Sequence, residues 1–204
     1  MKGFISFTIL FFTITLSAQT SAKKEYLFDE NNNVITQQEF KLKTAAPEYT
    51  YTYIIIKNDT AVIAKTVLRR EYGILSQEDR ERIISELKNV SGKSISDDQT
   101  IVINFFYTNR TNNKTLAYNH YPADAGYKKF IRKHPQYAQF FITEKGLLHK
   151  ENYVYEDTGD VIRNMLFKYP FEANYIIIKP NGHYFRHVGE YRQDEIPDIL
   201  QADW

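Results

Sequence analysis

The chain contains no cysteine in its 204 residues. This absence excludes disulfide bonds, a thiolate nucleophile and every metal site that needs cysteine ligands. Stability must therefore come from packing alone. The sequence is rich instead in aromatic residues, with 16 tyrosines and 14 phenylalanines, and such side chains bury large areas in a protein core.

The N-terminal segment has almost no charge. Residues 1–18, "MKGFISFTILFFTITLSA", contain one lysine, an apolar and hydroxylic run from Gly3 to Leu16, and then small residues. This pattern predicts a secretory signal peptide cleaved after Ala18, or alternatively after Ala22. The run is shorter than the roughly 20 residues of a membrane span, although a retained N-terminal anchor is the alternative. We expect a periplasmic or secreted protein with no membrane span in its mature chain.

The mature chain also lacks an excess of either charge. Removal of residues 1–18 leaves 25 basic and 25 acidic side chains. Nucleic-acid binding needs a surplus of lysine and arginine on one face, so we predict no nucleic-acid partner. The remaining length suits one domain with a full core.

The first half of the mature chain changes from polar to strongly patterned. Residues 19–47 are predicted to form an N-terminal arm with a possible strand pair, "EYLF" and "NVIT", around the turn "DENNN". Residues 49–73 alternate aromatic and β-branched residues around "KNDT", which predicts a β-hairpin. The next segment has apolar residues at helical spacing, begins at a capping Ser76 and stops at Gly92, so it predicts a helix.

The second half alternates strands and helices. "TIVINFFY", residues 100–107, is short and continuously apolar, which predicts a central strand buried on both faces. A helix, a strand, a helix, a hairpin and a short helix are predicted to follow in "DAGYKKFIRKHP", "QYAQFFITE", "DTGDVIRNMLFKYP", "ANYIIIKPNGHYFRHVGEY" and "RQDEIPDILQ". The predicted fold class is α/β, with a mixed central sheet flanked by helices over residues 48–204.

Two segments carry a resemblance to a known family. "TIVINFFYTNRTNN" is similar to the strand that leads into the redox turn of the thioredoxin-like superfamily, where V-N-F-W-A-T-W-C-x-x-C is usual. "NYIIIKPNGHYFRHVGEY" resembles the closing hairpin of that superfamily. The resemblance covers about the last hundred residues and implies that the hairpin of residues 49–73 is an N-terminal extension of the sheet.

The sequence departs from the family pattern at the positions of the redox cysteines and of the cis-proline. The two cysteine positions fall on Arg110 and Asn113, and the position of the family's cis-proline falls near Ala173 or Asn174. Thiol–disulfide exchange requires a thiolate, so that activity is excluded. The resemblance therefore implies a redox-inactive thioredoxin-fold protein that binds a peptide or an envelope protein without a cofactor.

The predicted binding groove lies where the family has its redox turn, because strand pairing beside that turn needs no thiol. Its predicted residues are Tyr107, Arg110, Thr111, Asn112, Asn113, Ala173 and Asn174. A helix N-terminus and a guanidinium could hold an anion there. The alternative is that Thr108, Thr111 and Asn112 cap a helix while the Arg110 side chain is solvated.

Two other functions remain open at this point. One is a non-thiol enzyme with Arg110 as an anion clamp and His120 or a tyrosine as acid and base. The other is an envelope interaction or immunity-type protein. His183 and His187 form an H-x-x-x-H pattern, but on a strand they would lie roughly 13 Å apart, too far for one metal ion; we expect two surface histidines and no metal site.

The first predicted hairpin offers two further features. Thr60, in "DTA", matches a three-residue acceptor for O-glycosylation in exported proteins of the Bacteroidetes, on a turn predicted to be exposed. Tyr49, Tyr51 and Tyr53 alternate and would place three rings on one face of a strand. Such rings could bind a sugar or peptide, or pack under a neighbouring helix.

Overall fold

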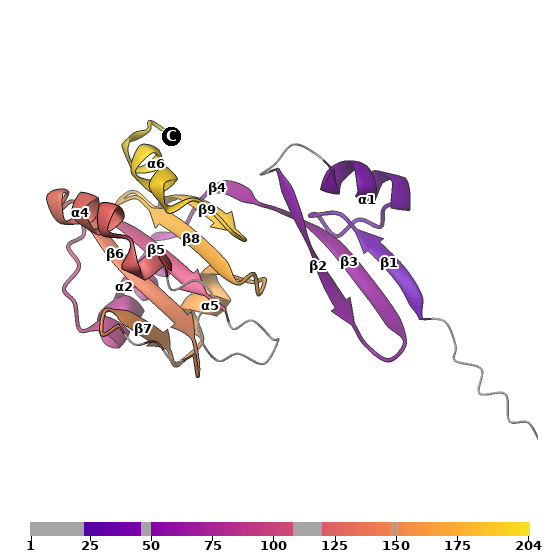
Figure 1. Cartoon of the computed structure of the whole chain (residues 1–204), viewed down its shortest axis with the longest axis horizontal. Helices are drawn as coiled ribbons and strands as arrows, with labels where there is room; N and C mark the ends of the chain where they lie inside the picture. The colour runs from indigo at the N-terminus through magenta and orange to yellow at the C-terminus, as the bar shows by residue number, and fades with distance from the viewer. Residues whose placement is uncertain (1–22, 46–49, 108–119, 148, 150) are drawn as a thin grey trace, which may run out of the picture.

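The computed structural model describes residues 23–45, 50–107, 120–147, 149 and 151–204, and their strands form two separate sheets (Figure 1). The larger sheet has six strands in the order β4-β9-β8-β5-β6-β7. These are β4 (Arg70–Ile74), β5 (Thr100–Phe106), β6 (Tyr137–Glu144), β7 (Val154–Asp157), β8 (Ala173–Ile178) and β9 (His183–Val188). The predicted signal peptide, residues 1–18, lies outside the described residues.

The larger sheet is mixed, as the sequence predicts. Strand β5 is parallel to β6 on one side and antiparallel to β8 on the other. Its side chains from Ile101 to Phe106 are all buried, which confirms the prediction of a central strand covered on both faces. The hairpin β8–β9 is antiparallel, and β4 adds to β9 at one edge of the sheet.

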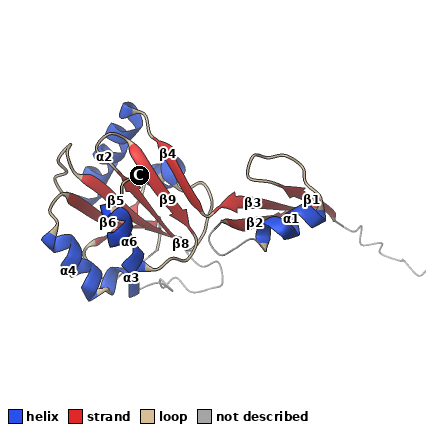
Figure 2. Cartoon of the chain, turned by 90° about the horizontal axis from the view of Figure 1, so that it is seen from above, coloured by secondary structure: helices blue, strands red, loops and turns tan. Residues whose placement is uncertain are grey.

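Helices cover both faces of this sheet (Figure 2). On one face, α2 (Gln77–Ser91) and α5 (Val161–Leu166) pack on Ile101 and Ile103. On the other, α3 (His120–Ala123), α4 (Ala125–Lys133) and α6 (Ile196–Gln201) pack on alternate residues of β5, among them Val102 and Phe106. A 3-10 turn, Gln193–Glu195, precedes α6. None of the described helices is long and apolar enough to cross a lipid bilayer.

The ends of α2 confirm the predicted capping. The Ser76 hydroxyl accepts the backbone N–H of Asp79 at 3.0 Å, and this satisfies one of the free donors at the helix N-terminus. Gly92 ends the helix with a φ of 67°, a conformation that glycine adopts without the steric penalty of a side chain.

The smaller sheet is built from the N-terminal part of the chain. Strand β3 (Ala61–Leu68) lies between β1 (Lys24–Phe28), which is parallel to it, and β2 (Tyr51–Lys57), which is antiparallel to it. Helix α1 (Gln37–Thr44) packs on this sheet. The segment predicted as an arm, residues 19–47, thus contributes a strand and a helix from Lys24 onward, and Phe28 forms a bridge with Val34 between the two apolar pieces noted in the sequence.

One expectation about the hairpin is wrong: β2 and β3 do not extend the larger sheet. The apolar run "AVIAKTVLRREYG" predicts one strand, but the structure divides it at Arg69 into β3 and β4, which belong to different sheets. The backbone N–H of Arg69 donates to Thr50 in the smaller sheet (3.0 Å), whereas its carbonyl accepts from Val188 in the larger one (2.9 Å). In a regular strand, the N–H and C=O groups of one residue point to the same neighbouring strand. At Arg69 they pair with different sheets, so this residue ends one ladder and begins the next.

Hydrogen exchange tests the difference in packing between the two sheets. No residue before Leu75 contributes to either hydrophobic cluster of the described chain, and the buried apolar residues of β3 are small. We expect the amides of β1 to β3 to exchange at least about tenfold faster than those of β5 and β8, because sparsely packed elements open at lower free energy. Mass-spectrometric exchange of the mature chain measures this. Equal protection in both sheets would show that they unfold as one unit.

Candidate functional site

The described residues of the predicted strand-end groove, Tyr107, Ala173 and Asn174, are buried. Tyr107 follows β5 and is buried; its hydroxyl donates to the Phe167 carbonyl at 2.5 Å and its backbone N–H to the Glu172 carbonyl at 3.0 Å. Burial raises the pKa of the Tyr107 hydroxyl well above its usual range. This tyrosine therefore stays protonated and joins β5 to the segment before β8.

Ala173 and Asn174, which the sequence predicts at the rim of the groove, open β8 and are fully buried. The Asn174 amide donates to the carbonyls of Phe171 (2.6 Å) and Phe105 (3.3 Å), and its oxygen accepts from Gly189 (3.4 Å). The Asn174 side chain is thus bonded to backbone groups of β5, of the segment before β8 and of the residue after β9. The remaining predicted residues, Arg110, Thr111, Asn112 and Asn113, lie outside the described part of the chain.

Among the described residues, no group of three or more His, Cys, Asp or Glu side chains lies where it could hold a metal ion. His187 corrects one expectation, because it is fully buried rather than on the surface. Its ring lies 5.4 Å from that of Tyr175. Burial and, secondarily, the positive charges of Arg70 and Arg69 lower the pKa of His187 to about 3. His120 is exposed at the start of α3.

The other predicted features lie on the smaller sheet. Thr60 is exposed in the β2–β3 turn, where its hydroxyl donates to Asn58 at 3.1 Å, so it has the exposure that O-glycosylation would require. Tyr53 packs edge-on against Phe40 of α1, with ring centroids 5.9 Å apart. The Tyr51 hydroxyl lies 3.4 Å from a Glu30 oxygen, and Tyr49 lies outside the described residues. The described tyrosines of the stripe thus face α1.

A groove is present elsewhere, at the β7 edge of the larger sheet. Strand β6 has eight residues but β7 only four, and β7 pairs with Phe141–Glu144. On this side no strand of the described chain pairs with Tyr137–Phe140. A cavity of about 360 Å³ follows this uncovered half of β6. Side chains reach it from both faces of the sheet, as expected for an open strand edge.

The backbone of β6 presents hydrogen-bonding groups to this groove. Thr100 of β5 donates to the Gln136 carbonyl at 3.0 Å. Because alternate residues of a strand direct their N–H and C=O groups to opposite neighbours, Ala138 and Phe140 face β5. The N–H and C=O groups of Gln139 then face the groove, where an added strand would pair with them.

A chain of buried and partly buried hydrogen bonds fixes the floor of the groove. The Gln139 amide donates to Asn104 of β5 at 2.7 Å and to the Phe140 carbonyl at 2.7 Å, and its oxygen accepts from the Tyr127 hydroxyl of α4. Asn104 is fully buried and donates in turn to the Tyr191 hydroxyl. With its side chain held on one face, Gln139 leaves the edge of the strand uncovered.

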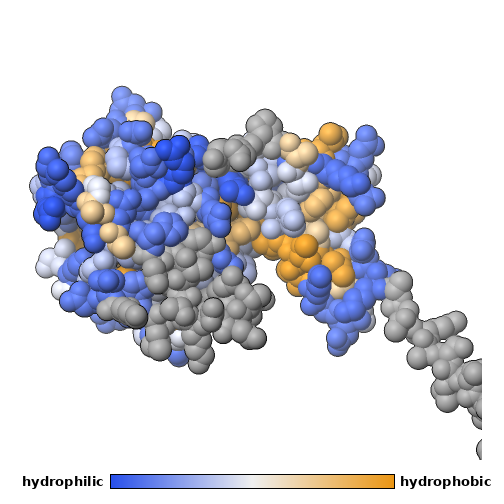
Figure 3. All heavy atoms as spheres, viewed as in Figure 1, coloured by the Kyte–Doolittle hydropathy of each residue, from blue (hydrophilic) through white to orange (hydrophobic). Residues whose placement is uncertain are grey.

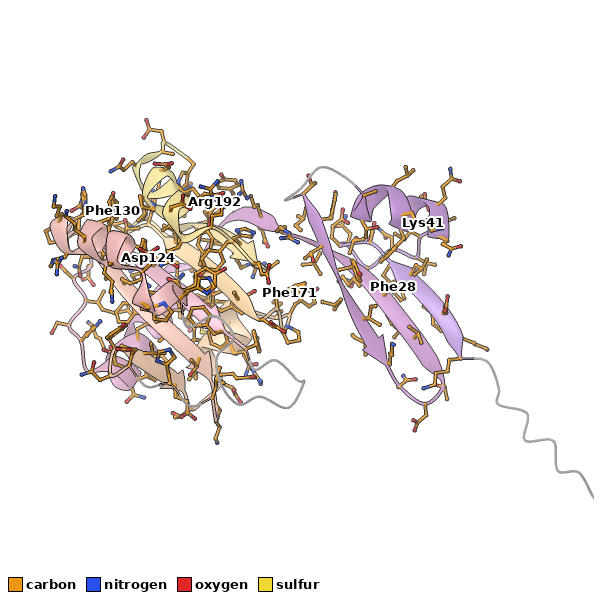
Figure 4. The ribbon with its side chains drawn as sticks, in the orientation of Figure 1. Phe28, Lys41, Asp124, Phe130, Phe171 and Arg192 are labelled. Carbon is orange, nitrogen blue, oxygen red and sulfur yellow. The ribbon has the colours of Figure 1, made fainter. Side chains whose placement is uncertain are left out.

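Aromatic rings and cations form the walls. The rings that line the cavity belong to Tyr127, Tyr137, Phe140, Phe141 and Tyr153. Lys128 of α4, the helix that also carries the labelled Phe130 in Figure 4, lies 5.3 Å from the Tyr153 ring. From the opposite face, Lys93 lies 5.4 Å from the rings of both Phe140 and Tyr155.

This groove is not predicted from the sequence. Its residues come from the loop after α2, from α4, from β6 and from the segment before β7, and are brought together only by folding. One local signal was available: Gln139 is a polar residue inside the otherwise apolar run "YAQFF". A polar side chain that a strand partly buries needs hydrogen-bond partners, so Gln139 marks a position where hydrogen bonds cross between elements.

No family model, curated protein or solved structure shows significant similarity to the chain.

The buried histidine gives a prediction for the pH dependence of stability. The folded protein holds His187 neutral down to about pH 3, whereas the unfolded chain binds a proton below about pH 6.5. Stability should therefore fall as the pH drops through this interval, by up to about 1.4 kcal/mol per pH unit. Urea unfolding at several pH values measures the slope. His187→Gln should flatten it, whereas His183→Gln on the same strand should retain it; equal slopes in wild type and His187→Gln would contradict this account.

Proposed function

We propose that this protein is an exported, redox-inactive binding module that holds an extended peptide, or an extended segment of an envelope protein, at the open edge of β6. A thioredoxin-like core is supported by the mixed sheet in which the central β5 lies beside the closing hairpin β8–β9. Export is supported by the sequence pattern of residues 1–18. Binding requires no sulfur, in keeping with the absence of cysteine.

The observation that carries this proposal is the uncovered half of β6. An extended peptide can add to such an edge as a further strand, with main-chain hydrogen bonds giving affinity and side-chain pockets giving specificity. Both are available: the Gln139 backbone faces the groove, and five aromatic rings line it. The family resemblance implies a binding site at the end of β5. The proposed site lies instead at the edge of β6, the adjacent strand.

Binding of displayed peptides tests this function. Selection of extended peptides on the mature chain should yield ligands that protect the Gln139 amide from hydrogen exchange, because that N–H gains a partner. Tyr153→Ala should weaken binding about tenfold, since it removes one aromatic wall; Tyr26→Ala, on the smaller sheet, should not. Thermal unfolding of both variants checks that the fold is retained. Failure to select any ligand, or protection at other strands only, would refute the proposal.

A second candidate function is favoured by the apolar surface of the smaller sheet. The nine large hydrophobic residues that are exposed in the described chain all lie between Tyr26 and Ile74. Figure 3 shows apolar surface gathered over this part of the molecule. Tyr26, Ile63 and Ile56 are cross-strand neighbours, on the face opposite α1 because Ile56 is three residues from the helix-packed Tyr53. Exposed patches of this kind mark interaction surfaces, here with an envelope protein.

Site-specific photo-crosslinking tests the second function. A photoreactive residue in place of Ile56, which is 53% exposed, should form a crosslink to an envelope protein in the native host. The same residue in place of Leu42, which is 66% exposed on α1, is the matched control and should not form that crosslink. Identical adducts from both positions, or none from either, would remove support for a docking face at β2.

A further inference from the structure

We infer that the β6 groove selects an extended segment with acidic side chains at two neighbouring positions. This inference rests on the proposed function, since it specifies the chemistry of the peptide that would add to β6. It follows from the distribution of charge around the groove and from the alternation of side chains along a strand.

The groove has a charge of one sign. Three cationic side chains line it, Lys93, Lys128 and Arg132, and none of the described lining residues is Asp or Glu. The mature chain as a whole has equal numbers of acidic and basic side chains, so this is a local concentration of positive charge. A ligand with negative charge is the one that complements it.

The cations are available to a ligand. None of the three forms an ion pair within the described chain. Two of them lie near aromatic rings, Lys128 at Tyr153 and Lys93 at Phe140 and Tyr155. A cation held near a ring keeps its positive charge, and the contact reduces the side-chain entropy that would be lost when a carboxylate binds.

The positions of the cations define the spacing of the acids. Lys128 and Arg132 lie one turn apart on α4, whereas Lys93 packs over Phe140 on the opposite face of the sheet. Successive side chains of a strand point to opposite faces. Adjacent ligand residues would therefore meet α4 and Lys93 respectively. The uncovered part of β6 has four residues, or about 13 Å of strand. This length is enough to pair with both of the adjacent acidic residues of the ligand.

The aromatic rings define the neighbours of the acids. Tyr127, Tyr137 and Tyr153 line the cavity beside Lys128, so the aliphatic part of the ligand residues would pack on rings while the carboxylates reach the cations. The open backbone groups of Gln139 require a partner with its own N–H and C=O groups. An extended acidic peptide satisfies both requirements, whereas a free inorganic anion satisfies only one.

A charge-swap experiment tests this inference on the mature chain. The probes are end-capped peptides, Thr-Val-Glu-Glu-Val-Thr and the matched peptides with Gln-Gln or Lys-Lys at the centre. We expect the Glu-Glu peptide to bind at least about tenfold tighter than the Gln-Gln peptide, with affinity falling as salt is raised. Lys128→Glu should reverse the preference toward the Lys-Lys peptide. Lys129→Glu, exposed on the same helix but outside the groove, should change affinity less than about twofold.

The outcomes separate the two proposals. If peptides selected by display bind at β6 but Lys128→Glu and Lys128→Met leave their affinities unchanged, the acidic specificity is wrong while peptide binding stands. A preference of the wild-type chain for the Gln-Gln or Lys-Lys peptide would likewise overturn it. If no peptide of any charge binds at β6, the proposed function fails and this inference fails with it. Thermal unfolding of each variant confirms that a lost affinity reflects the groove and not the fold.

Discussion

The difference in length between β6 and β7 is the constraint on which the groove depends. β7 pairs with only the second half of β6, and the chain before it follows a different path. The Tyr153 hydroxyl donates to the Pro122 carbonyl of α3 at 3.0 Å, and the Val154 N–H to Glu151 at 3.2 Å. These bonds hold the segment before Val154 beside α3. The same tyrosine thus limits the extent of β7 along β6 and supplies a wall of the groove.

The side-chain amides of Asn104 and Gln139 explain how an open edge can have a fixed shape. A polar side chain such as Asn104 is costly at the centre of an apolar strand unless it is hydrogen-bonded. Here its bonds extend from Gln139 of β6 to Tyr191, and Tyr121 of α3 donates to the Tyr191 carbonyl at 2.8 Å. The network thus connects β6 to α3 through Asn104 of β5 and through Tyr191. It therefore fixes α3 and β6 relative to each other, which keeps the groove formed in the absence of a ligand.

Sequence reasoning succeeded where the determinant is local. The continuous apolar run of β5 and the caps of α2 each specify an element within a few residues. The sequence did not predict those features that depend on contacts with residues distant along the chain. The division at Arg69 depends on which strands pair with the N–H and C=O groups of that one residue. Strand β7, with four residues, is too short to show a period in its sequence. The groove residues, such as Lys93 and Tyr153, are distant in sequence and carry no common pattern before folding.

The strand order has a consequence for how the two proposed surfaces could act together. The groove lies at the β7 edge of the larger sheet, whereas the chain passes to the smaller sheet from β4, at the opposite edge. Four strands separate these edges, so a peptide at β6 and a protein on the face of Tyr26, Ile63 and Ile56 would occupy different sides of the molecule. One module could thereby hold a segment of one protein while docked on another.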